Sequence, residues 1–450
     1  MLGDFVMNQF TSNRKCVVFC LLSLALTTVT AFSETETEAP KPTGMGVEAS
    51  RAIAAAKDRR AEEAYEKRNS EITPWVEDGT PPKQGNAALL YYQAFLLRPE
   101  PPEAIKYKIH SVTEPIKQFR TYLGHCLPMI EIVEIASRMP CIWGVWPERR
   151  LSMEALRKGL GPIQDILLMD ARALAADGHY RVALERCLTL RRIAKHLSED
   201  PELYIYSTGF DMLPLNVVGD VLSVMPPDAE TLTWFRGQFA VVPGPRLSYA
   251  EMLQARIRRF LNHMRTTPKS LRYYKNLAIK EAEGEQAKEN VRNLTDEQFL
   301  ARAGEGFARF LDSIFRVLDS EMTYEQKLVQ MNGLYNEKMK GDNTDPVDKS
   351  VITMFPGVSG YSYLVEHSAY VNGVKAAVEV YLVLAKTGHL PRKLPDHLPK
   401  DPYTDRDFIY EIKDEGFALR CQGKKFQGWS KRRLEFKVKS KDKSRFGPDN

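Results

Sequence analysis

The sequence predicts a mainly α-helical protein, made of helical hairpins or a bundle with a small C-terminal antiparallel β-sheet of about three strands. Three observations lead to this prediction. Long segments repeat apolar residues at helical spacing, two of them begin with a capping box (at Ser248 and Thr295), and strict apolar–polar alternation occurs only after residue 389. A helical domain, solenoid-like at most in part, is therefore expected to end in a sheet.

The first 31 residues have the features of a signal peptide. Arg14 and Lys15 form a short positive region, an uncharged apolar run follows at 16–30, and cleavage is expected after Ala31. The alternative is an uncleaved anchor formed by 16–32, which is near the minimum length for crossing a bilayer. Export to the periplasm or the cell exterior is expected, with membrane contact only through this segment if it is uncleaved.

A polar leader and a charged, solvated helix are predicted over 32–85, before a helical domain over 86–388. Residues 86–97 are apolar on nearly all sides, which predicts a deeply buried helix. The next helix, at 114–138, should kink or split at Pro128 because proline cannot donate the helical hydrogen bond.

The clearest unit of the helical domain is a hairpin of two helices, at 152–177 and 179–197, separated at Gly178. Residues 280–293 are highly charged and are expected to be mobile, and a loop is expected at 357–361. Further helices are predicted at 204–225, 228–239, 248–264, 296–319 and 324–339.

The helix predicted at 248–264 has an apolar stripe with Arg256, Arg258 and Arg259 off it. Such a stripe can dock on a membrane or on a partner helix. The alternative is an ordinary core stripe with a solvated basic face on the other side.

A Pro-rich loop and the small sheet are predicted over 389–440, with strands at 408–412, 416–421 and 434–439. Lysines alternate with inward apolar residues in the third strand, a pattern typical of an edge strand protected from aggregation. A basic disordered tail is expected at 441–450.

Composition excludes several classes of protein. With 450 residues, 43% hydrophobic and 27% charged, the chain is neither intrinsically disordered, collagen-like nor a disulfide-dense miniprotein. The formal net charge of +5 is uneven, because residues 424–445 contribute +8 and residues 32–423 contribute −3. A basic end can bind anionic polymers or lipid.

Four cysteines lie outside the predicted signal peptide, at 126, 141, 187 and 421. An oxidising compartment permits a disulfide, and Cys126 and Cys141 are the closest pair in sequence. The alternative is that all four are buried thiols that pack as small hydrophobic residues.

The segment 141–150 is the strongest candidate for a ligand-binding site, because tryptophan and arginine are favoured in binding surfaces. The candidate residues are Trp143, Trp146, Arg149 and Arg150, which could bind a sugar, a peptide or an acidic group. The alternative is that the two tryptophans fill the junction between helical units.

The sequence predicts no catalytic residues, metal or cofactor. It has no His-Glu-x-x-His motif, phosphate-binding glycine loop or dinucleotide fingerprint. Glu131 and Glu134 share a helix face and are the candidate acid pair of a hydrolase. Asp401, Asp405 and Asp407 suggest either a calcium site or, as the alternative, a turn stabilised by aspartate side chains.

The C-terminal part resembles an uncharacterised exported helical protein family of planctomycete-type bacteria. The matching motifs are Ala385-Lys-Thr-Gly388-His-Leu-Pro391, Leu398-Pro399-Lys-Asp401-Pro402-Tyr403 and Asp414-Glu-Gly416-Phe417-Ala-Leu419, with Asn86-Ala-Ala, Met139-Pro-Cys141 and Asp177-Gly178 upstream. The ending is also similar to the end of type II secretion pseudopilins. The family implies a helical body with a small terminal sheet and supplies no activity or site residues.

The function expected from these features is a non-enzymatic binding or scaffolding role in the bacterial cell envelope. Its partner would be a protein or an envelope polymer, and no specific nucleic-acid binding is expected. The alternatives are an envelope hydrolase with dispersed catalytic residues and a membrane-tethered interaction protein.

Overall fold

The computed structural model describes residues 44–71, 85–103, 117–143, 153–200, 203–242, 244, 248–341, 344–353, 355, 357–422 and 433–437. The chain divides into two compact units, Met1–Ala56 and Lys57–Asn450. Helix α2 (Gly44–Glu71) begins in the first unit and ends in the second. The predicted signal peptide, the polar leader and the basic tail lie outside the described residues.

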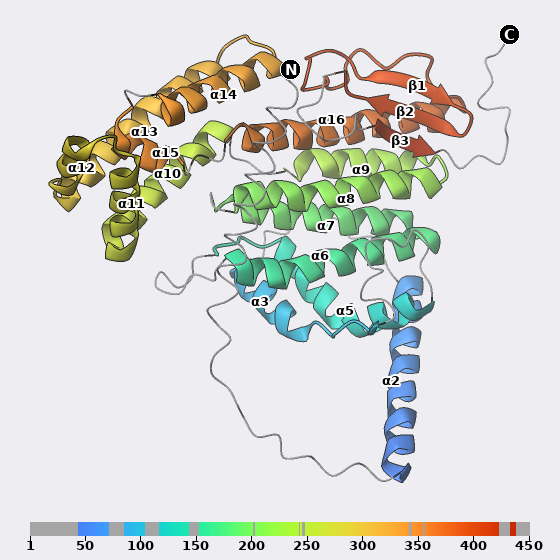
Figure 1. The fold of residues 1–450 in the computed structure, drawn as a ribbon. Coiled ribbons are helices and arrows are strands. Elements are labelled where there is room, and N and C mark those ends of the chain that lie inside the picture. The colour runs from blue at the N-terminus through green and yellow to red at the C-terminus, as the bar shows by residue number, and fades with distance from the viewer. Residues whose placement is uncertain are drawn as a thin grey trace. The chain divides into compact units, whose positions relative to one another are not determined.

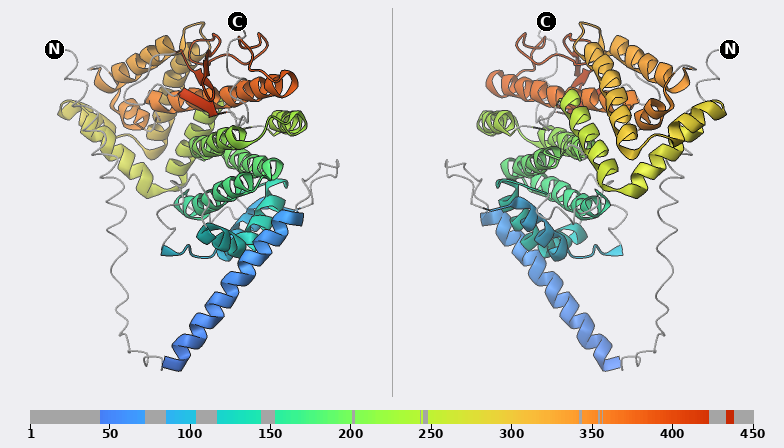
Figure 2. Two further views of the ribbon diagram at one scale, coloured as in Figure 1. Left: turned by 90° about the vertical axis from the view of Figure 1, so that its right-hand side faces the viewer. Right: turned by 90° about the vertical axis from the view of Figure 1, so that its left-hand side faces the viewer.

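The second unit contains a layered stack of helices, seen in Figures 1 and 2, in which α6 packs on α7 and α7 on α8. The sheet and helix α16 pack on α8, α9 packs on α7 and α16, and α3 and α5 lie beside α6. The helices of this stack are α3 (Ala87–Leu97), α5 (Lys117–Ser137), α6 (Met153–Ala176), α7 (Tyr180–Ser198), α8 (Tyr204–Val224), α9 (Ala229–Val241) and α16 (Gly357–Thr387).

The predicted hairpin is confirmed by α6 and α7. Gly178 has φ +89°, a left-handed conformation that glycine adopts without steric cost, and it turns the chain between the two helices. Helix α7 is buried on nearly every side, including its charged residues Glu185 and Arg186. The hairpin therefore forms the centre of the stack.

A second group of helices follows α9 and has its own apolar clusters. Capping boxes at Ser248 and Thr295 begin α10 and α13, as predicted, and a third at Thr323 begins α14. The helices are α10 (Tyr249–Thr266), α11 (Pro268–Glu281), α12 (Glu285–Arg292), α13 (Asp296–Leu318), α14 (Tyr324–Lys340) and α15 (Pro346–Ile352).

Three antiparallel strands form the C-terminal sheet in the order β1-β2-β3: β1 (Ile409–Lys413), β2 (Gly416–Arg420) and β3 (Arg433–Lys437). Phe417 pairs with Phe436 across the ladder, and their rings stack at 5.1 Å. Both rings contact Tyr381 of α16, so the sheet packs on that helix through aromatic residues. The mainly α-helical fold with a small sheet is confirmed, and β3 lies at the edge as predicted.

Several local predictions were wrong. Helix α5 is not split at Pro128, because Pro128 is exposed and the buried residues Leu123, Met129 and Ile130 hold the helix on both sides of it; a kink there stays a prediction. Residues 280–293 contain the end of α11 and all of α12, which packs inward through Val291. The expected loop at 357–361 is the first turn of α16.

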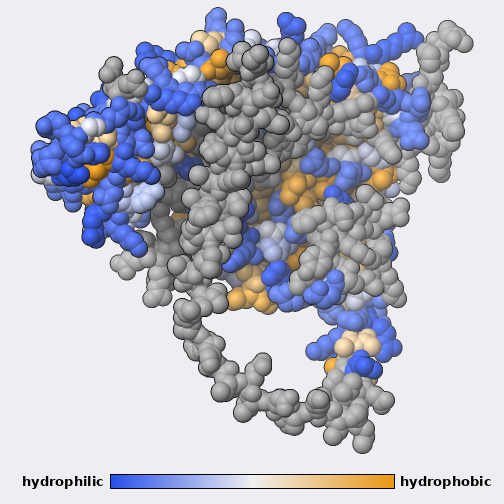
Figure 3. All heavy atoms as spheres, viewed as in Figure 1, coloured by the Kyte–Doolittle hydropathy of each residue, from blue (hydrophilic) through white to orange (hydrophobic). Residues whose placement is uncertain are grey.

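Burial of α3 is only partial. Tyr91 and Ala94 are fully buried, whereas Leu89 is 51% exposed and Leu96 is 87% exposed. A helix that is apolar on all sides does not show in its sequence which face packs against the core. The prediction of deep burial was wrong for the face that carries Leu89 and Leu96. Figure 3 shows a hydrophobic area over α3.

The charged helix α2 is less solvated than predicted, because Ala61, Tyr65 and Asn69, four residues apart, form a buried stripe. Among the described residues no helix has the length and the hydropathy that a membrane span requires.

Candidate functional site

Trp143 lies in a packed aromatic junction between α3 and α7. Its ring stacks on Tyr91 with 5.5 Å between centroids, and its indole Nε1 donates a hydrogen bond of 2.8 Å to the carbonyl oxygen of His196. Tyr91 also contacts His196 directly, with 3.0 Å between its hydroxyl and Nδ1. Trp143 thus fills the junction, which is the alternative that the sequence left open. Trp146, Arg149 and Arg150 lie outside the described residues.

Cys126 and Cys141 are both free thiols, and both are buried in the core of the helical stack. Burial raises the pKa of Cys126 to about 12, and burial also raises the pKa of Cys141. Thiols held in the protonated form are weak nucleophiles and weak metal ligands.

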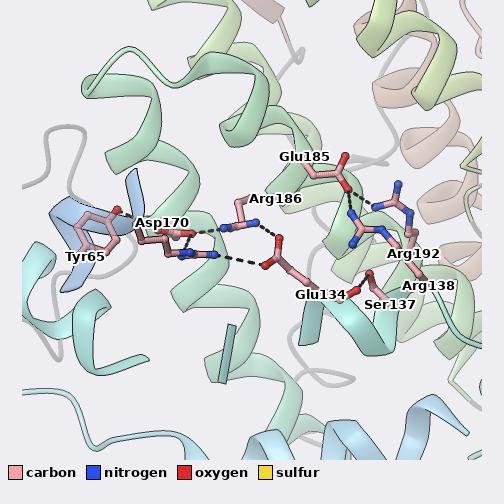
Figure 4. Close-up of polar contacts among 9 residues, drawn as sticks. Tyr65, Glu134, Ser137, Arg138, Asp170, Glu185, Arg186 and Arg192 are labelled. Carbon is pink, nitrogen blue, oxygen red and sulfur yellow. Dashed lines mark hydrogen bonds and ion pairs between the residues drawn. The ribbon is translucent and has the colours of Figure 1, made fainter. Parts of the chain in front are cut away.

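A group of buried and partly buried charges forms what we call the arginine–carboxylate cluster (Figure 4). Its first part centres on Arg186 of α7, whose Nε donates to Asp170 Oδ2 at 2.6 Å and whose Nη1 donates to Glu134 Oε1. Tyr65 of α2 donates to Asp170 Oδ1 at 3.0 Å. Arg68 of α2 lies 3.4 Å from Glu134 and 3.9 Å from Asp170.

The second part of the cluster centres on Glu185, the neighbour of Arg186 in α7. Its Oε1 accepts hydrogen bonds from Arg138 at 2.6 Å and from Arg192 at 2.7 Å. Together the two parts join α2, α5, α6 and α7 through charged side chains. Four arginines face three carboxylates, so the cluster has a formal charge of +1 in its interior.

Burial and neighbouring charges shift the pKa values of several residues of this cluster. Burial alone would lower the pKa of Arg186, but Glu134 and Asp170 outweigh this effect and hold the pKa above its usual value. Burial lowers the pKa of Arg138, where the stabilisation by Glu185 is insufficient to compensate. Burial, followed by the Asp170 carboxylate, raises the pKa of Tyr65, which therefore stays a hydrogen-bond donor.

A second buried group, the Asp211 group, lies further along the stack. Asp211 Oδ2 on α8 accepts from Arg191 Nη1 of α7 at 2.5 Å and lies 2.7 Å from His367 Nε2 of α16. Arg191 also donates from Nε to the carbonyl oxygen of Val242, just after α9. This group therefore joins α7, α8, α9 and α16. Asp211 Oδ1 makes no hydrogen bond.

A narrow gap in the packing adjoins the Asp211 group, between α7, α8 and α9. Arg191 and Asp211 reach its wall, and Cys187, Leu215 and Phe235 make much of the rest apolar. It is too narrow to admit a water molecule. The gap is thus a packing defect beside the ion pair and offers no space for a substrate.

Neither buried group has the composition of a metal centre, and no set of three metal-ligating side chains converges in the part of the chain that the structure describes. Asp401, one of the calcium candidates, is fully buried and organises a turn. Its Oδ1 accepts from the backbone N–H of Tyr403 at 3.0 Å, and its Oδ2 accepts from that of Gln422 at 2.6 Å. Asp407 instead pairs with Lys400.

The sequence prediction missed both buried groups. One signal was present: Arg191 occupies the apolar stripe of α7, a position where a charge must find a buried partner. Many of the partners are far apart in the chain, 105 residues for Tyr65 with Asp170 and 156 residues for His367 with Asp211. No local pattern identifies contacts at such separations.

Comparison with known proteins gives no relative: no protein-family model, curated protein or solved structure matches this chain.

Proposed function

We propose that the protein is an exported, non-enzymatic binding or scaffolding protein of the bacterial cell envelope. The observation that supports this best is the use of the buried charges. The arginine–carboxylate cluster ties α2, α5, α6 and α7, and the Asp211 group ties α7 onward to α8, α9 and α16. Charged groups that bind one another across successive helices hold those helices in one arrangement, which suits a rigid scaffold.

Export of the protein from the cytoplasm is inferred from the sequence. A positive region followed by an apolar run and Ala31 has the features of an export signal, and the resemblance to exported helical proteins agrees with it. Cell fractionation followed by N-terminal sequencing tests it. We expect the chain outside the cytoplasm, beginning at Phe32; a full-length chain in the cytoplasmic fraction contradicts export.

The hydrolase alternative required Glu131 or Glu134 to face a cavity beside the tryptophans. Glu134 is ion-paired with Arg186 and Arg68, and Trp143 fills the junction. Among the described residues no observation favours this alternative.

Turnover assays test the non-enzymatic role. We expect no product when the purified full chain is incubated with peptidoglycan, peptides or glycans. Product formation by the wild-type chain would overturn the proposal, and loss of that product in Glu131→Gln or in Glu134→Gln would show that a candidate acid is responsible.

A further inference from the structure

The α10–α11 segment is the most basic part of the described body. Residues 249–281 contain eight lysines and arginines and two glutamates, a net charge of +6, whereas 32–423 as a whole has −3. Two of the cations have structural partners: Arg259 binds Asp200 at 2.5 Å, and Lys275 donates to the Leu294 carbonyl oxygen at 2.7 Å.

Other cations of α11 lie on one exposed face. Leu271 and Ala278 pack into the core on one side of the helix. The opposite side presents Lys269, Arg272, Tyr273, Asn276 and Lys280, all of them exposed. Their spacing of three, four and seven residues places them on a single stripe. The stripe contains no carboxylate.

The basic stripe is extended by the end of α10. Arg265 is exposed three residues before α11 begins, and Arg258 is exposed two turns earlier on the same side of α10. The ring of His263 lies 2.9 Å from Ser270 Oγ and 3.3 Å from Thr267 Oγ1, which holds the end of α10 to the start of α11. We call Arg265 together with the five residues of the α11 stripe the cationic face. Figure 3 shows α11 and α12 covered by hydrophilic residues.

We propose that the cationic face binds an extended anionic polysaccharide, one whose sugars carry carboxylates. This inference rests on the proposed binding function and names its partner class. The cations supply charge for the carboxylates. Asn276 supplies both a donor and an acceptor for sugar hydroxyls. Tyr273, which is 62% exposed, offers an apolar ring face against which a sugar ring can pack.

The dimensions suit a linear polymer. Lys269 and Lys280 lie about 16 Å apart along the helix axis at 1.5 Å per residue. A stripe of this length can contact several consecutive sugars. Nucleic acid and anionic lipid also present negative charge, and they are therefore the competing ligands in the test of this proposal.

Fluorescence anisotropy of a fluorescein-labelled oligogalacturonate, titrated with the full chain at low salt, tests this proposal. We expect binding that weakens with added salt, and K269E/R272E/K280E should weaken it about tenfold or more because three charges are reversed. The matched control K57E/R59E/R60E reverses three exposed cations of α2 and should have less than about a threefold effect. Y273A should weaken binding by about threefold or more with an unchanged salt dependence.

Circular dichroism shows whether each variant is folded, and K269Q/R272Q/K280Q replaces the charge-reversed variant if that one is not. Equal weakening by both charge reversals would overturn the proposal, because net charge alone would explain it. Tighter binding of poly(dT) or of phosphatidylglycerol vesicles, or an unaffected Y273A variant, would also overturn it. Product formation in the turnover assays would contradict the proposed function; an unchanged K269E/R272E/K280E variant would contradict only this inference.

Discussion

Asp170 and Arg186 bear on stability because both are out of contact with water. The side chain of Asp170 has no exposed surface, and that of Arg186 is 2% exposed. Such a pair is costly to desolvate, and its net contribution can be small. Removing Asp170 is a different matter, since four arginines then face only two carboxylates, and part of the positive charge is left without compensation.

We therefore expect Asp170→Ala to lower the free energy of unfolding by about 3–5 kcal/mol. The physical reason is that Arg186 Nε and the Tyr65 hydroxyl both lose their acceptor, while only the Glu134 carboxylate still accepts from Arg186. Urea unfolding followed by circular dichroism measures the loss. Tyr65→Phe is the control, because it removes one hydrogen bond to a charged acceptor and should cost about 1.5–3 kcal/mol. A loss below about 1 kcal/mol for Asp170→Ala contradicts the uncompensated-charge argument.

His196 makes stability depend on pH. Burial, followed by Lys195 and Arg192, lowers the pKa of His196 to about 4 from 6.5. The unfolded chain therefore takes up a proton between pH 6.5 and 4 that the folded chain does not, and stability falls as the pH falls through this range. The loss from this residue is about 3 kcal/mol when complete.

Urea unfolding at pH 7, 5.5 and 4.5 measures this dependence. In His196→Gln the part of the slope due to His196 should disappear, although the variant itself is less stable because Tyr91 loses its ring partner. A slope that is the same in wild type and variant would show that His196 is protonated in the folded protein.

At the scale of the element, Gly124 lets α2 approach α5. A Cβ placed at Gly124 would lie 2.0 Å from the carbonyl oxygen of Ala61, a backbone atom that cannot move alone. We expect Gly124→Ala to displace the 57–71 part of α2, with faster amide hydrogen exchange there and loss of the Tyr65–Asp170 hydrogen bond.

A matched control exists in α9. Gly237 is also helical, and a Cβ there meets no atom within 4 Å. Gly237→Ala should therefore stabilise the protein by about 0.5–1 kcal/mol through helix propensity, without affecting exchange in α2. Unchanged exchange of 57–71 in Gly124→Ala would mean that α2 does not pack at this glycine.

Elements with a local pattern could be predicted from the sequence, and elements without one could not. Gly178 predicted the α6–α7 turn, and Ser248 and Thr295 predicted the starts of α10 and α13, because these devices act within a few residues. Helix α12 was missed because half of its eight residues are charged, and Val291 is its one buried residue. The candidate site was the least predictable, since Glu134 and Arg186 meet across 52 residues.

At the scale of the second unit, the apolar core is divided into separate clusters of buried residues. One cluster runs through α3, α5 to α9, α16 and the sheet, and it includes Leu190. A separate cluster joins α10, α11, α13 and α15 around Phe307. The two share no residue, and a third cluster contains residues of α8, α10, α13, α14 and α16. Regions with separate cores can open separately.

We therefore expect Phe307→Ala and Leu190→Ala to destabilise different regions. Both side chains are completely buried, and each truncation should cost about 2–5 kcal/mol locally. In hydrogen-exchange mass spectrometry, Phe307→Ala should accelerate exchange in α11, α13 and α15 while α6 and α7 keep their protection. Leu190→Ala should accelerate exchange in α6 and α7 while α11, α13 and α15 keep their protection. Equal acceleration of all helices by either substitution would mean that the unit unfolds in one step, with the third cluster coupling the other two completely.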